Sequence, residues 1–154
     1  MVIVEDTRQQ AEKHKIKNEY FENHGIKVIR SKLPVGDYAR IDNMSVVIDT
    51  KKDIQEIIQN VTKDHKRFAA ECELAQEAGI KLIILIENED KVEKKEDLFK
   101  WYNWRLKTSP KATNGKTLYK ILKTMEEKYK VTFEFCSVEK SPEIIEKILK
   151  ELGE

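Results

Sequence analysis

The chain has 154 residues, of which 40% are hydrophobic and 37% are charged, and its formal net charge is +1 at pH 7. This length and hydrophobic content are sufficient for one core, so we expect a single domain over residues 1–154. The longest apolar run, residues 80–86, is too short to span a bilayer, and no signal pattern opens the chain. We therefore expect no membrane association and a soluble, intracellular protein located in the cytoplasm.

Neither the cysteines nor the overall charge identifies a function. Cys72 and Cys136 lack His or Cys neighbours at metal-ligand spacing, which argues against a zinc site or a disulfide framework and favours two buried thiols. The charge is uneven, however: residues 107–130 carry seven lysines and two glutamates, whereas residues 87–97 carry six acids and three lysines. The basic stretch is either a surface that faces DNA or an ordinary solvated helix face.

The first third of the chain predicts a strand, a helix, and then a strand followed by a hairpin. In the helix, Ile16, Tyr20 and Phe21 are expected on the buried face, and Gly25 ends it. Pro34 and Gly36 interrupt the extended segments. The expected ranges are a strand at 1–4, a helix at 11–24, a strand at 27–33, and hairpin arms at 38–41 and 46–49.

The remainder alternates between helical and extended patterns. A last helix is expected to begin with Ser141 as its N-cap and Pro142 in its first turn. The pattern predicts an α/β fold of the restriction-endonuclease-like kind, in which helices flank a central mixed sheet. The expected ranges are helices at 54–61 and 63–78, a strand at 81–86, a helix at 98–106, a mobile loop at 111–116, a helix at 117–129 and a strand at 131–136.

Three residues in the hairpin have the chemistry needed for phosphodiester hydrolysis. Asp49 and Lys51 are two apart on a strand and therefore share a face, while Thr50 is expected to point away. Asp37 begins the opposite arm, directly after Gly36, which permits a sharp turn. Two carboxylates and a lysine can hold a hard divalent cation and orient water. The alternative is that these are strand-end charges in surface ion pairs, because an Asp-X-Lys triplet arises readily in so charged a chain.

Several motifs follow one another in a fixed order along residues 1–90. They are Ile3-Val4-Glu5-Asp6-Thr7-Arg8, Leu33-Pro34-Val35-Gly36-Asp37-Tyr38, Val47-Ile48-Asp49-Thr50-Lys51, Asp64-His65-Lys66-Arg67-Phe68, and the strand that ends at Glu87. Together these motifs resemble one family, the nuclease domain of the xeroderma pigmentosum group F (XPF) type in the PD-(D/E)XK superfamily.

The chain departs from the family pattern at four positions. Asp49 stands where the family usually has Glu, Thr50 replaces Arg, Gln9 replaces Glu, and Gln55 replaces a later Asp. The two carboxylates and the lysine of the minimal metal site remain, whereas the cation of the family's Arg is lost at Thr50. The tandem helix-hairpin-helix module of many relatives is absent from the sequence, and the chain looks more like the stand-alone bacterial and phage forms.

The resemblance implies roles for the residues of the first two motifs and the Asp-X-Lys triplet. Asp37, Asp49 and the Thr50 carbonyl would ligate one or two Mg²⁺ or Mn²⁺ ions, and Lys51 would position the attacking water and stabilise developing charge. Asp6 would complete the catalytic group, either by ligating the metal or by bonding to its ligands; otherwise it caps a turn. Arg8 would hold the scissile or adjacent phosphate through two hydrogen bonds from its guanidinium, or is an exposed strand-end arginine.

Further residues are candidates for DNA contact. Arg67 is preferred over His65, since the two lie on different helix faces, and His14 and His24 are expected at the surface. Three aromatic residues either stack on unpaired bases or belong to the core or an oligomer contact. These aromatics are Trp101, Tyr102 and Trp104, and the lysines expected to contact backbone phosphates are Lys111, Lys116 and Lys120.

The expected function is therefore metal-dependent DNA cleavage, with flaps, branches or junctions as candidate substrates and DNA repair or recombination as the setting. A homodimer or a partner protein is a further expectation. The alternative is a catalytically inactive DNA-binding or scaffold subunit, although the retention of both carboxylates and the lysine favours activity. A Rossmann-like nucleotide-binding protein is disfavoured because no Gly-X-Gly-X-X-Gly follows the first strand.

Overall fold

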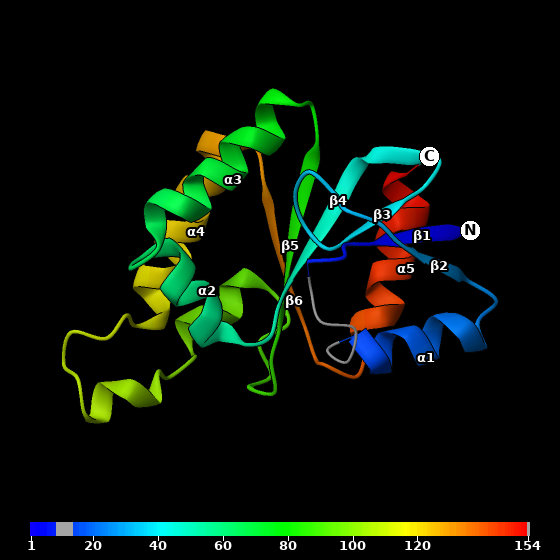
Figure 1. Ribbon diagram of the computed structural model, residues 1–154. Helices are drawn as coiled ribbons and strands as arrows, with labels where there is room; N and C mark the ends of the chain where they lie inside the picture. The colour runs from blue at the N-terminus through cyan, green and yellow to red at the C-terminus, as the bar shows by residue number, and fades with distance from the viewer. Residues whose placement is uncertain (9–13, 154) are drawn as a thin grey trace.

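A computed structural model describes residues 1–8 and 14–153. Its centre is a six-stranded sheet with the order β2-β1-β3-β4-β5-β6 (Figure 1). Strand β3 is antiparallel to β1 and β4, whereas the other neighbouring pairs are parallel. The predicted mixed sheet flanked by helices is thus confirmed. The strands are β1 Val2–Glu5, β2 Lys27–Arg30, β3 Tyr38–Arg40, β4 Asn43–Lys51, β5 Lys81–Glu87 and β6 Thr132–Cys136.

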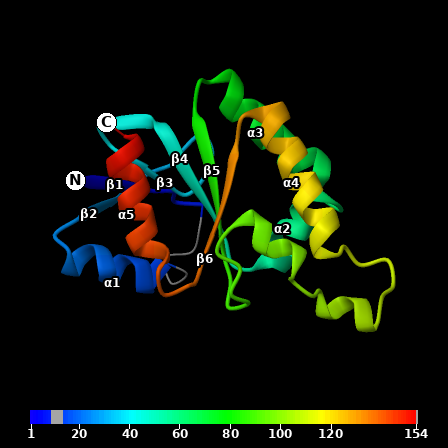
Figure 2. The same cartoon turned by 180° about the vertical axis from the view of Figure 1, so that it is seen from behind.

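Helices cover both faces of this sheet. Helices α2, α3 and α4 lie over one face, and α1 and α5 lie over the other (Figures 1 and 2). Strand β5 is buried on both sides, which explains its nearly unbroken apolar sequence. Successive residues alternate between the two cores, with Ile84 on the α3 side and Ile83 on the α5 side. The helices are α1 Lys15–Asn23, α2 Ile54–Val61, α3 His65–Glu77, α4 Gly115–Tyr129 and α5 Ser141–Leu152.

The orientation of α1 differs from the prediction. Ile16 is 63% exposed, and the buried residues of the helix are Lys17 and Phe21, four apart. Lys17 is buried because its ammonium lies 2.8 Å from a carboxylate oxygen of Glu87, a partner on the distant strand β5. His14, expected at the surface, is also buried, and its ring nitrogen Nδ1 bonds with the Tyr38 hydroxyl. The predicted start of this helix at residue 11, like Gln9, lies outside the described residues.

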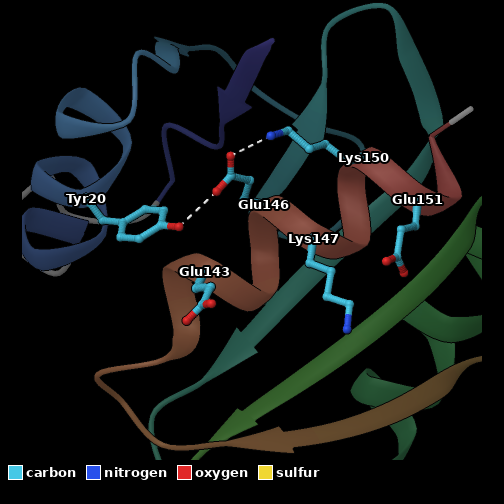
Figure 3. A pocket seen from close by; sticks show the side chains of 6 residues that line it. All are labelled: Tyr20, Glu143, Glu146, Lys147, Lys150 and Glu151. Atoms are coloured by element: carbon cyan, nitrogen blue, oxygen red, sulfur yellow. Dashed lines mark hydrogen bonds and ion pairs between the residues drawn. The ribbon is translucent and has the colours of Figure 1, made fainter.

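A side-chain network joins α1 to α5 (Figure 3). The Tyr20 hydroxyl donates to Glu146 at 2.8 Å, and Glu146 also pairs with Lys150 at 2.8 Å. At the start of α5 the N-cap is Lys140, not Ser141 as predicted, and the Ser141 hydroxyl instead donates to Glu87 at 2.6 Å. Because Glu87 is buried, a hydrogen bond from Ser141 to its carboxylate stabilises the fold more than an N-capping bond from Ser141 would. Pro142 does occupy the first turn, as expected.

The predicted helix at 98–106 is wrong. Two short 3₁₀ segments stand there, η2 Lys95–Phe99 and η3 Trp104–Lys107. Asn103 between them is buried; its amide donates to the Thr113 carbonyl, and its side-chain oxygen accepts from Gln55 and the Arg105 amide. These bonds hold Asn103 in an extended conformation, so a continuous helix cannot pass through it.

Two further expectations concern the cysteines and the membrane. Cys72 and Cys136 are both buried free thiols, as predicted. Over the part of the chain that the structure describes, every helix is too short or too polar to cross a membrane.

Candidate active site

Five of the predicted site residues converge on one polar cavity of about 270 Å³ between the β3–β4 hairpin and α3. The cavity is walled on one side by the segment Pro34–Asp37, which enters β3. The charged residues that line it are Asp6, Arg8, Asp37, Asp49, Lys51 and Glu71.

Gly36 allows this segment to approach β4. It has φ +76°, and a Cβ built on it would lie 2.5 Å from Cγ1 of Val47 and 3.2 Å from the Ile48 carbonyl oxygen. Any larger residue would both clash and strain the backbone. The close approach lets the Asp37 amide donate to the Ile48 carbonyl at 2.8 Å, which fixes Asp37 beside the end of β4.

The Asp37 carboxylate is oriented by Thr50. The amide and the hydroxyl of Thr50 each donate to Oδ2 of Asp37 at 2.8 Å. Thr50 was expected to point away from the site, but its short side chain reaches across to the adjoining strand end. Burial raises the pKa of Asp37 above its ordinary value, and the two bonds from Thr50 counteract part of that rise.

Asp49 and Lys51 form a largely buried ion pair. The Lys51 ammonium lies 3.1 Å from Oδ2 of Asp49, so the two side chains share a face of β4, as predicted. The same ammonium lies 5.3 Å from the centre of the Phe68 ring on α3. Burial raises the pKa of Asp49 to about 6 against the attraction of Lys51, and the neighbouring Asp37 carboxylate adds to the rise.

The carboxylate pair Asp37–Asp49 fits a hard divalent cation. Two buried neighbouring carboxylates that resist ionising together are stabilised by a positive ion between them. Among residues 1–8 and 14–153, no three His, Cys, Asp or Glu side chains converge on one point. The pair therefore suits Mg²⁺ or Mn²⁺, which are commonly held by one or two carboxylates with water completing the shell, better than a zinc or calcium cage. Participation of the Thr50 carbonyl stays a prediction.

Asp6 and Arg8 form a second unit at the cavity wall. Oδ1 of buried Asp6 accepts from the Leu33 amide at 2.7 Å, and Oδ2 accepts from the Arg8 amide and Nε at 3.1 and 2.9 Å. Arg8 also donates to the Leu33 carbonyl at 2.7 Å. Burial opposes ionisation of Asp6, but the bonds from Arg8 and Leu33 outweigh it and lower its pKa. Both Asp6 oxygens are thus occupied by donors, an arrangement that suits positioning Arg8 better than ligating a metal.

Glu71 is a residue of the cavity that the sequence motifs did not indicate. It lines the cavity from α3, within electrostatic reach of Asp49 and Lys51, and although the residue is exposed, partial desolvation of its carboxylate together with Asp49 raises its pKa. Within the described ranges it has no hydrogen-bond or ion-pair partner. The available signal was its position on α3, three residues after buried Phe68 and beside buried Cys72. That spacing places Glu71 at the border of the buried face but cannot say which strands the helix covers.

Other predicted DNA contacts lie outside this cavity. Arg67 is exposed, and its guanidinium lies 3.3 Å from Asp64. Lys111, Lys116 and Lys120 are exposed on α4 and the loop before it, and none of them lines the cavity. The structure therefore groups Asp6, Arg8 and the carboxylate–lysine site, while the basic stretch forms a separate surface.

Two solved structures with similar folds are both XPF from Aeropyrum pernix. One matches with a TM-score of 0.71 and 14% identity over 99% of this chain and 65% of that chain. The other, described as a complex with DNA, matches with a TM-score of 0.69 and 16% identity over 99% of this chain and 64% of that chain. This chain thus spans slightly less than two thirds of their length. No curated protein matches it by sequence.

The sequence itself carries the signature of one domain family. The model of the ERCC4 domain matches residues 5–146, which include the opening Asp-Thr-Arg segment, both carboxylates and the last helix as far as its middle. The match agrees with the fold and with the XPF-type resemblance expected from the motifs. The chain belongs to the ERCC4 domain family.

Proposed function

We propose that this protein is an Mg²⁺- or Mn²⁺-dependent endonuclease that hydrolyses phosphodiester bonds in DNA, and that residues 1–154 act as a single nuclease domain. The observation that supports this most is the buried Asp37–Asp49 pair beside Lys51 in an open polar cavity. Burying two carboxylates side by side costs stability unless a cation offsets their charge. Their presence in the cavity therefore indicates a function such as binding a cation. An inactive DNA-binding or scaffold subunit would gain nothing from keeping them, so that alternative is less favoured.

Five of the charged residues that line the cavity have a role in this proposal. Asp37 and Asp49 hold the cation, which supplies Lewis-acid polarisation of the scissile phosphate when bound. Lys51, held by Asp49, orients the attacking water and stabilises negative charge that develops on the phosphate. Arg8 binds a phosphate oxygen from the cavity wall, and Asp6 acts as a positioning residue that fixes the Arg8 guanidinium.

DNA is the proposed substrate because the chain belongs to the ERCC4 domain family and an XPF structure of similar fold is described as a complex with DNA. Flap, branched and junction DNA are the candidate structures, with repair or recombination as the setting. Arg67 and the lysines of the basic stretch would contact the backbone without reading sequence. A second copy of the chain or a partner protein would add further contacts.

Cleavage should require a divalent cation. Purified protein incubated with linear duplex, single-stranded, flap and four-way-junction DNA should cut at least one of them with Mg²⁺ or Mn²⁺ and none with EDTA. Restoring Mn²⁺ to the EDTA-treated protein is the control, since it should restore cutting. Cleavage that persists in EDTA would contradict the metal role. DNA binding without cleavage in either metal would support the inactive-subunit alternative.

The basic stretch should contribute to DNA affinity rather than to chemistry. Replacing Lys111, Lys116 and Lys120 by Gln should weaken DNA binding and reduce the slope of log affinity against log salt by up to about 3, since each lost phosphate contact removes about one released counterion. Affinities measured at several salt concentrations give this slope. The cut position should not move.

A matched triple variant provides the comparison for this experiment. It replaces three exposed lysines on the opposite side of the molecule, Lys15, Lys27 and Lys147, and it changes the net charge by the same amount. It should leave the slope nearly unaltered. If the two triple variants behave alike, only overall charge matters and α4 does not face DNA.

A further inference from the structure

The active-site cavity adjoins a second cavity, which in turn adjoins a third. Lys51 lines both it and a second cavity of about 340 Å³, which is bordered on the other side by Lys17 and Glu87. Lys52 in turn lines both this second cavity and a third one of about 260 Å³. The three cavities are therefore neighbours in a row, with Lys51 between the first and the second and Lys52 between the second and the third.

The third cavity lies beyond the carboxyl ends of the three parallel strands β4, β5 and β6. Its lining comes from residues 52–55 after β4, residues 88–90 after β5 and Val138 after β6, together with Trp101 and Trp104. Ligands of open α/β sheets bind characteristically at this edge. The cavity is therefore in a favourable place to receive a part of the substrate that the carboxylate pair does not contact.

Trp104 gives this cavity an exposed aromatic face. It is 59% exposed, and the Arg105 guanidinium lies 5.4 Å from its ring centre. Trp101 is more buried, and its indole N–H donates to Asp90 at 3.0 Å, so it serves as a fixed wall. A large exposed indole next to a cation is typical of surfaces on which unpaired bases stack.

The charges along the row of cavities attract a phosphate at Lys52 and repel one from the third cavity. Lys52 has no ion pair within residues 1–8 and 14–153, whereas Lys17 is already neutralised by Glu87. The third cavity is also lined by acids. Asp53, Glu89 and Asp90 accept bonds from the Glu56 amide, the Val138 amide and Trp101, respectively, and they would still repel a phosphate. This environment suits an uncharged base, with the adjoining phosphate at Lys52.

We propose that the third cavity is a stacking site for an unpaired base of the DNA. The strand that carries this base would run from the carboxylate pair past Lys51 and Lys52 to the cavity. A duplex does not fit this description, because its bases are stacked on one another and it would bring phosphates against the acids. Stacking on Trp104 would also be insensitive to base identity. This inference rests on the proposed nuclease function for the position of the cut, and it specifies a substrate with a single-stranded segment next to that position.

Binding measured in EDTA tests the site without cleavage. Wild type should prefer a duplex with a single-stranded extension over a blunt duplex, and Trp104→Ala should weaken binding of the extended DNA by roughly 5- to 100-fold, as expected for one lost stacking contact. Blunt-duplex affinity should be unchanged. Trp104→Phe should recover most of the loss. Tyr102→Ala is the matched control, since Tyr102 is 56% exposed nearby but does not line the cavity.

Lys52→Gln tests the phosphate contact separately. For the extended DNA it should reduce the slope of log affinity against log salt by about 1, since about one fewer counterion is released. The slope for the blunt duplex should be unchanged. Circular dichroism confirms that each variant is folded. Equal losses on extended and blunt DNA for Trp104→Ala, or an equal loss for Tyr102→Ala, would overturn the stacking site.

The outcomes also separate this inference from the function on which it rests. If Trp104→Ala has no effect on binding while wild type cuts DNA, the stacking site is wrong and the nuclease proposal stands. If extended DNA binds through Trp104 but no DNA is cut with any metal, the nuclease proposal fails and the strand-binding site stands.

Discussion

Replacing Lys51 by methionine should lower the single-turnover cleavage rate by about a hundredfold or more, the scale typical of losing one preorganised charged donor. The folded structure should survive, because methionine keeps most of the length of the lysine side chain and is a flexible, apolar residue that tolerates burial beside Phe68. DNA affinity should change little, since Lys51 is largely buried in its pair with Asp49. The loss should therefore appear in the rate and not in binding.

Metal affinity of the Lys51→Met variant should depend on pH. Removing the ammonium removes a cation that competes with the metal, so Mg²⁺ or Mn²⁺ affinity at pH 8 should hold or rise. The attraction of Lys51 also lowers the pKa of Asp49, so without it a proton holds Asp49 more firmly. At pH 6, near the pKa of Asp49 in the wild type, the proton should therefore compete better with the metal, and the variant should lose its advantage. Titration calorimetry at the two pH values measures this change.

Lys81→Met is the control for Lys51→Met. Lys81 is exposed at the opposite end of the same sheet, where it begins β5, so the substitution should affect neither the rate nor metal affinity. A Lys51→Met protein that cuts DNA at a nearly wild-type rate would remove Lys51 from the mechanism and weaken the case for the whole site.

Replacing Asp49 by asparagine should reduce cleavage to background and remove most of the metal binding, because one of the two carboxylates is lost. In the wild type, Mg²⁺ or Mn²⁺ should raise the melting temperature, since a ligand that binds only the folded state stabilises it. In Asp49→Asn that rise should vanish. The metal-free variant should melt within a few degrees of the wild type, because two effects oppose each other. Removing the buried charge of Asp49 stabilises the fold, whereas leaving Lys51 without its partner destabilises it.

The direction of the pH effect follows from the raised pKa of Asp49. Folding shifts this pKa from 3.8 to about 6, so the folded protein binds the proton more tightly than the unfolded chain does. The carboxylate therefore costs the metal-free protein stability above about pH 6, and the cost is relieved as the pH falls from 6 toward 4. The metal-induced rise in melting temperature should shrink over the same interval, since protons then displace the cation.

Asp42→Asn is the matched control for Asp49→Asn. Asp42 is exposed at the turn of the same hairpin and pairs with Arg40, so the same chemical change should leave metal binding and cleavage intact. Full cleavage by Asp49→Asn would exclude this carboxylate from the chemistry, whatever its pKa.

The sequence by itself determined the features that depend on local pattern. Alternation and apolar runs located β4 and β5, and the two-residue spacing of Asp49 and Lys51 placed both on one face. The glycine before Asp37 indicated the tight approach that Gly36 makes to Val47. The ordered motifs indicated the family to which the chain belongs.

Only the tertiary structure decided how individual polar groups are used. Nothing in the local pattern shows that Leu33 and Arg8 occupy both oxygens of Asp6, or that Glu71 faces Asp49 across the cavity. The burial of Lys17 likewise follows from Glu87, which is 70 residues away in the chain. Helical and strand periodicities identify the face on which a residue lies, but its partner is set by which elements pack together. Because a buried polar group is stable only with the partner that packing supplies, these roles appear only once the chain is folded.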